Sequence, residues 1–204
     1  AIRRGNKSQF ASTQEHRQRI VNLIKDYRTL LGQGVVARFD PENYSDAVAF
    51  ARIGEGSLGG KARGLAFMNS MILKHRLYDK HANVRIMIPR SVVIATDYFD
   101  DFIRLNGLKY IISQEFSDEE ILSEFVSSTV PARLQQELKA YIQTVRTPLA
   151  VRSSSKLEDS HYQPFAGIYS TYMIPYVDNG DQMLRLLLKA VKSVYASVYF
   201  ATSR

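Results

Sequence analysis

The first hydrophobic pattern along the chain is a helical stripe near the N-terminus. A Ser-x-x-Glu capping box at residues 12–15 predicts the start of a helix, and Gly32 predicts its end. Between them, apolar residues recur three or four positions apart, at Ile20, Leu23, Ile24, Tyr27, Leu30 and Leu31. Because the stripe spans barely two heptads, we favour a helix that packs on its own domain over a connector or a short coiled coil.

Helical and strand patterns alternate along the rest of the chain. Apolar spacing predicts helices over residues 65–78, 97–108, 117–145 and 181–204. Apolar runs predict strands at 84–88 and 91–96, another that begins after Pro148, and a partner for it in a hairpin within 167–177. This mixture predicts an α+β fold with α/β-like layers, in which helices flank a mixed sheet over residues 46–204. Residues 1–45 are expected to form a basic arm and an amphipathic linker helix.

Composition and charge narrow the functional classes. The net charge is +7, but residues 1–38 hold eight basic and two acidic residues, so the rest of the chain is almost neutral. This distribution argues against a nucleic-acid-binding face. No apolar run approaches the roughly 20 residues needed to cross a bilayer, and the N-terminus lacks the apolar stretch of a secretory signal. The chain has no cysteine, which excludes disulfides and thiolate catalysis and is typical of a cytoplasmic protein.

A glycine cluster, GEGSLGGKARG at residues 54–64, holds five of the 11 glycines. Bare backbone amides beside a cation suit a phosphate group. Two known phosphate motifs fit poorly, because no acid ends the next strand as a dinucleotide site requires, and a P-loop would need glycine at 55 and a hydroxyl at 62. What remains is a bend that leads into a helix whose first turn carries Lys61 and Arg63. These cations either bind phosphate or are simply solvated.

A second unusual stretch covers residues 150–171. Arg152 lies in a strand-like run and is followed by three serines and then by Glu158 and Asp159. An arginine that leaves a strand among hydroxyl groups is suited to a phosphate, but it could equally pair with one of those two acids. Two anion-binding stretches about ninety residues apart suggest a single site assembled from both.

These stretches resemble a known family. LGGKARGLAFMNSM resembles an L-G-G-K-G-x-x-L element, and PLAVRSSSKLEDSHYQPFAGIYST resembles a V-R-S-S-x-x-x-E-D-x-x-x-x-S-F-A-G-x-x-x-T element. IPRSVVIATDYFDDF and KAVKSVYASVYFATSR resemble two further elements in the same order. All four are similar to the ATP-binding domain of phosphoenolpyruvate synthase and pyruvate phosphate dikinase. The resemblance covers residues 53–204 and leaves residues 1–45 uncovered.

The resemblance implies the N-terminal subdomain of an ATP-grasp fold, with ATP and Mg²⁺ as ligands and phosphoryl transfer as the chemistry. It implies that Arg152 is both the catalytic residue and a phosphate ligand, and that Glu158 and Asp159 order the loop over the phosphates. The other residues implied to bind ATP are Lys61, Gly59, Gly60, Gly167 and Thr171. No metal ligand is expected within this chain. Departures from the family pattern occur at Ser91, Pro164 and Ile168, and they concern the loop more than phosphate binding.

The resemblance also implies a longer parent protein. The second ATP-grasp subdomain and the phosphohistidine domain are expected outside this chain, so the isolated fragment is expected to be inactive. In the parent, the phosphoryl group would pass through a histidine to pyruvate or a related acceptor. Two alternatives stay open, namely a non-catalytic nucleotide-sensing or scaffold module, and the ATP half of an antibiotic or glucan water dikinase. The expected partners are ATP and the downstream domains. A homodimer and the role of His161 are left open.

Overall fold

The structure is a computed structural model that describes residues 14, 17–21, 36–42, 44, 50–80, 83–84, 86–112, 115–155 and 170–203. Residues 17–21 are helical, in agreement with the predicted N-terminal helix, and the remainder of that helix lies outside the described residues. The domain boundary at residue 45 stays a prediction. Within the described part of the chain, no helix has the length and apolar character that crossing a membrane would require.

Three short strands form a parallel sheet in the order β1 (Ala37–Arg38), β2 (Phe50–Ile53) and β3 (Ser91–Ile94). β2 is the central strand, and all four of its residues pair with β3. The strand predicted at residues 84–88 is wrong, because none of its described residues lies in a strand. Ile88 is instead buried among apolar side chains outside any ladder. An apolar run of this length does not distinguish a strand from a packed loop.

The strands β4 (Leu149–Arg152) and β5 (Thr171–Ile174) form a separate antiparallel pair, which confirms the predicted hairpin pairing. Leu149 lies opposite Ile174, and Arg152 lies opposite Thr171. Side chains alternate between the two faces of a strand. One face of the pair packs on the core, while the other carries Arg152 and Thr171 together with Met173, which is 71% exposed.

Beyond the helical residues 17–21, the described part of the chain has five α-helices. They are α2 (Gly59–Lys74), α3 (Thr96–Leu105), α4 (Asp118–Ser127), α5 (Ala132–Thr144) and α6 (Gly180–Ser197). Short 3-10 turns occupy Leu77–Asp79, Leu108–Ile112 and Ala201–Ser203. The single helix predicted over 117–145 is two helices, because the residue before Pro131 is disfavoured in helical conformation. Ser117 and Glu120 form a capping box that starts α4.

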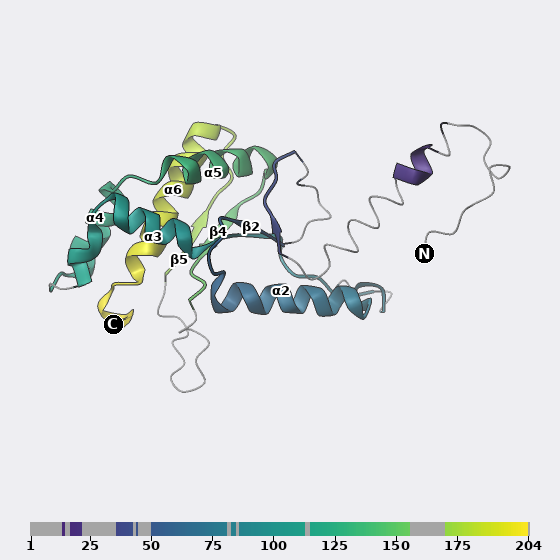
Figure 1. Cartoon of the computed structure of the whole chain (residues 1–204), viewed down its shortest axis with the longest axis horizontal. Helices are drawn as coiled ribbons and strands as arrows, with labels where there is room; N and C mark the ends of the chain where they lie inside the picture. The colour runs from purple at the N-terminus through teal and green to yellow at the C-terminus, as the bar shows by residue number, and fades with distance from the viewer. Residues whose placement is uncertain are drawn as a thin grey trace.

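The two faces of β2 are buried in different apolar clusters. Ala51 and Ile53 belong to the large cluster, which is built mainly from α3, α4, α5 and α6. Phe50 belongs to a small cluster with Ala62 of α2 and Ile88. Figure 1 shows the same arrangement, with α2 along one side of the strands and the other helices gathered on the opposite side. The α+β class predicted from the sequence is therefore confirmed, with its parallel and antiparallel strands in two sheets.

Candidate phosphate-binding site

The glycine-rich loop, residues 54–58, leaves the carboxyl end of β2 and is held by the residues that follow β3. Because β2 and β3 are parallel neighbours, the segments after them meet at one edge of the sheet, which is where α/β sheets commonly bind ligands. The Asp97 carboxylate accepts hydrogen bonds from the backbone N–H groups of Glu55 and Gly56, at 2.9 and 3.0 Å. The Thr96 hydroxyl accepts a third from Ser57 at 3.0 Å. The N-terminal end of α3 therefore fixes three consecutive loop amides.

Two loop glycines are needed because Asp97 lies so close. Gly54 has φ +93°, and a Cβ there would lie 2.6 Å from an Asp97 carboxylate oxygen. A Cβ at Gly56 would lie 2.6 Å from the Asp97 backbone nitrogen. Both contacts are shorter than real Cβ atoms tolerate. The glycine spacing therefore serves the approach of loop to helix, a role that the sequence analysis did not assign.

Asp97 is held as a carboxylate. Burial alone would raise the pKa of its side chain, but hydrogen bonds from the backbone N–H groups of Glu55, Gly56 and the first turn of α3 outweigh burial and lower that pKa below 3.8. The carboxylate also lies at a helix N-terminus, where negative charge is stabilised. Sequence reasoning missed Asp97 as a site residue. The signal was a Thr-Asp pair that begins a helix one residue after a strand.

The first turn of α2 is joined to the end of β4 through Ser154. The Ser154 hydroxyl accepts a hydrogen bond from the Ala62 N–H at 2.9 Å and donates one to the Leu58 carbonyl at 2.8 Å. In a regular helix the Ala62 N–H would donate directly to the Leu58 carbonyl, and the Ser154 hydroxyl lies between these two groups instead. Gly59 has φ +75°, and a Cβ there would lie 1.4 Å from the Ser154 carbonyl oxygen. Only glycine fits at this crossing.

This contact brings the two predicted phosphate-binding stretches together. Lys61 lies in the first turn of α2 next to Ala62, and Arg152 lies two residues before Ser154. Thr171 pairs with Arg152 across the hairpin and is exposed on the same face. Arg63 donates a hydrogen bond to the Ser57 hydroxyl at 3.1 Å, so it contacts the loop.

The remaining residues that the sequence analysis assigned to this region cannot be placed. Gly167, Glu158, Asp159 and His161 lie outside the described residues. The pairing of Arg152 with either acid, which the sequence left open, is therefore untested.

The electrostatics of the α2 N-terminus favour an anion. The amides of a first helical turn point out of the helix and carry the positive end of its dipole, and in α2 this turn begins at Gly59 and Gly60. The N-cap residue Leu58 makes no side-chain cap, and no acidic residue lies in this turn. These groups together fit a phosphate. Among the described residues, no three His, Asp or Glu side chains lie close enough together to hold a metal ion.

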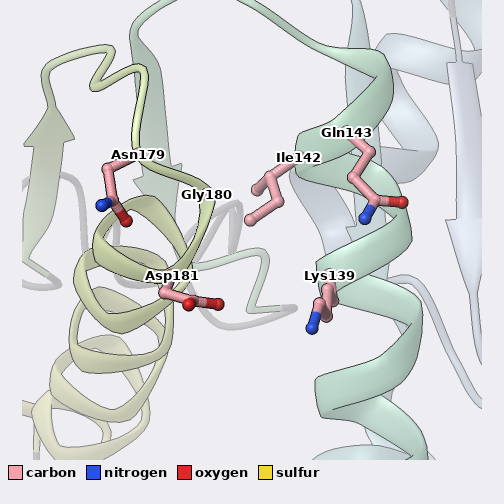
Figure 2. A pocket seen from close by; sticks show the side chains of 6 residues that line it. All are labelled: Lys139, Ile142, Gln143, Asn179, Gly180 and Asp181. Atoms are coloured by element: carbon pink, nitrogen blue, oxygen red, sulfur yellow. The ribbon is translucent and has the colours of Figure 1, made fainter.

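A shallow, open pocket lies elsewhere in the described part of the molecule. It has a volume of about 350 Å³ and is formed where α5 ends and α6 begins, as Figure 2 shows. Its lining residues are Lys139, Ile142, Gln143, Asn179, Gly180 and Asp181. None of them belongs to the glycine-rich loop, to α2 or to the β4–β5 hairpin. This pocket therefore carries no part of the candidate phosphate site.

The comparison that decides the family covers residues 55–203, which is more than two thirds of the chain. The sequence model of the family "Pyruvate phosphate dikinase, AMP/ATP-binding domain" matches residues 55–203. The chain belongs to this family. No curated protein and no solved structure matches the chain. Membership in the pyruvate phosphate dikinase ATP-binding family supports ATP as the ligand and a dikinase-type transferase as the class of protein.

Ser154→Ala is expected to lower the free energy of unfolding by about 1–2 kcal/mol, because the Ala62 N–H loses its acceptor and the Leu58 carbonyl loses its donor. Urea denaturation followed by circular dichroism measures the change. Ser123→Ala is the matched control, since Ser123 is exposed on α4. Equal denaturation midpoints for the two variants would contradict the assigned role of Ser154.

Proposed function

We propose that this chain is the ATP-binding part of a phosphoenolpyruvate synthase-like dikinase, and that Lys61 and Arg152 bind the phosphate groups of ATP. The observation that carries the proposal is the Ser154 contact, since it joins the strand that bears Arg152 to the helix turn that bears Lys61. This contact supports a single site that draws one cation from each of two segments about ninety residues apart. This is the arrangement that gripping a polyphosphate requires.

Each proposed ligand supplies a different interaction. Lys61 is a flexible point charge, suited to phosphate oxygens whose positions change during transfer. Arg152 has a planar guanidinium that can bind two phosphate oxygens and stabilise the charge that develops on the transferred group. Gly59, Gly60 and Gly167 offer backbone amides without side chains in the way, and Thr171 offers a hydroxyl beside Arg152. Catalysis by these groups is positioning and charge stabilisation.

Magnesium is proposed as the accompanying metal, held by residues outside this chain. Among the described residues, no three His, Asp or Glu side chains gather in one place. When bound, the ion would neutralise phosphate charge. The roles proposed for Lys61 and Arg152 do not depend on where it is held.

Lys61→Ala and Arg152→Ala are each expected to weaken ATP binding about 10- to 100-fold, because a hydrogen bond to a charged group contributes about 1.5–3 kcal/mol. Isothermal titration of ATP into the parent protein, in the presence of magnesium, measures the affinity. Lys74→Ala, in the last turn of the same helix, and Arg104→Ala, exposed on α3, remove the same charges away from the site. We expect the two controls to bind ATP like the wild type. If all four variants bind equally, the proposed site is wrong.

The transfer of phosphate through a histidine outside this chain to pyruvate or a related acceptor is the finer part of the proposal. Incubating the parent protein with radiolabelled ATP should yield an acid-labile, base-stable labelled protein, which is the stability expected of phosphohistidine. Added pyruvate should then discharge the label. A label that never appears on the parent would contradict the phosphohistidine route, whereas a label that pyruvate leaves in place would point to a different acceptor.

A further inference from the structure

Glu137 on α5 is the centre of a group of polar contacts outside the motifs described above. One of its carboxylate oxygens accepts a hydrogen bond from the Tyr98 hydroxyl at 3.0 Å. The same oxygen lies 3.4 Å from the guanidinium nitrogens of Arg38 and of Arg133. The side chain of Glu137 is only 20% exposed. An acid so covered, with three partners from three elements, is held in one orientation.

Two routes lead from Glu137 to the glycine-rich loop. Along the first, Arg38 lies 3.7 Å from the carboxylate of Glu55, and Glu55 lies 2.8 Å from Arg52. Arg52 also donates a hydrogen bond to the carbonyl of Gly54. The first route therefore ends on the Glu55 side chain and the Gly54 carbonyl of the loop.

The second route runs through α3. Tyr98 directly follows Asp97, whose carboxylate holds the amides of Glu55 and Gly56. Glu137 fixes the Tyr98 hydroxyl, and burial together with this hydrogen bond raises the pKa of Tyr98 to about 12. The guanidinium of Arg133 also lies over the Tyr98 ring, 5.9 Å from its centre. The first turn of α3, which carries the loop-binding groups, is thus anchored to α5.

We infer that Glu137 is a positioning residue for the glycine-rich loop, setting the loop geometry that nucleotide binding uses without touching the nucleotide. This inference rests on the proposed ATP site. We expect Glu137 to affect the geometry of the glycine-rich loop more than the stability of the fold. Arg38 and Glu55 are 51% and 59% exposed, and ion pairs between such exposed side chains contribute little to the stability of a fold.

Glu137→Gln separates positioning from simple electrostatics, because the two predict opposite changes. Removing a negative charge near an anion site would strengthen ATP binding if only the charge mattered. If Glu137 positions the loop, the variant loses its ionic contacts with Arg38 and Arg133, and ATP binding weakens by roughly three- to tenfold. Tyr98→Phe removes the other contact without changing any charge and should weaken binding in the same direction.

The experiment combines two measurements on the same protein. Isothermal titration gives the affinity for ATP, and NMR-detected hydrogen exchange without nucleotide reports the amides of residues 55–57. We expect exchange at these amides to be roughly three- to tenfold faster in Glu137→Gln and Tyr98→Phe. Glu119→Gln, an exposed acid in the first turn of α4, is the charge-matched control and should change neither value.

The outcomes distinguish this inference from the proposed function. If the wild type binds ATP and Glu137→Gln alters neither affinity nor exchange, the positioning role is wrong. Tighter ATP binding by Glu137→Gln, with unchanged exchange, would show an electrostatic role instead and also overturn it. A third outcome is that neither the wild type nor any variant binds ATP, while hydrogen exchange at the loop amides is faster in Glu137→Gln and Tyr98→Phe. In that case the proposed function fails, and the structural link between Glu137 and the loop stands.

Discussion

Gly59→Ala is expected to destabilise the protein by at least about 3 kcal/mol and to abolish ATP binding. Part of the cost is conformational, because alanine at φ +75° pays about 1–2 kcal/mol. The larger part is steric, since the new Cβ would overlap the Ser154 carbonyl and force the first turn of α2 away from β4. In a protein of this size the loss lowers the melting temperature by roughly 6–12 °C. Differential scanning calorimetry measures the shift.

Gly64→Ala provides the matched control for this substitution. Gly64 lies in the same helix, and a Cβ built on it meets no atom within 4 Å. Alanine at an open position inside a helix stabilises by about 0.5–1 kcal/mol relative to glycine. The two Gly→Ala changes should therefore move the melting temperature in opposite directions. If Gly59→Ala is as stable as Gly64→Ala, the close crossing of α2 and β4 does not exist.

Asp97→Ala should produce the second largest effect, a loss of about 3 kcal/mol together with a disordered glycine-rich loop. The Glu55 and Gly56 amides would lose a charged acceptor, and hydrogen bonds to charged groups contribute about 1.5–3 kcal/mol each. Chemical denaturation gives the stability, and hydrogen exchange at residues 55–57 reports the loop. Asp100→Ala, exposed on the same helix, should change the stability by less than about 0.5 kcal/mol.

The pH dependence of stability offers an independent check on Asp97. Its pKa in the folded protein is lowered from 3.8, so its hydrogen bonds stabilise the fold above that pH, and this contribution is lost as the pH falls through the folded-state pKa. Between pH 5 and the acid limit of folding, the wild type should therefore lose more stability than Asp97→Asn. Parallel curves for the two proteins would show that the carboxylate charge contributes nothing.

Local sequence patterns predicted the parts of the site that are local in the chain. The glycine cluster marked the bend before α2, and the run after Pro148 marked the strand that carries Arg152. The partners of these segments could not be predicted, because Asp97 is about forty residues from the loop it holds and Ser154 is 92 residues from Ala62. Such contacts depend on which strand ends meet in space. No periodicity in the sequence records that.

The wrong strand at 84–88 has a related cause. Alternation of apolar and polar residues reports burial, and burial alone does not require a ladder partner. Ile88 satisfies the pattern by filling the small cluster beside Phe50. The pairing of β4 with β5, in contrast, was predictable because Pro148 marks the entry to β4 and β5 is rich in β-type residues.

The division of β2 between two apolar clusters has a consequence for how this domain can change. The large cluster secures most of the fold, whereas the apolar face of α2, the helix that carries Lys61, packs in the small cluster around Phe50, Ala62 and Ile88. Substitutions in that small cluster can change how tightly α2 packs on the sheet, while the remainder of the domain keeps its fold. Different substitutions should therefore change the affinity for the ligand and the stability of the fold, in natural variants and in engineered ones.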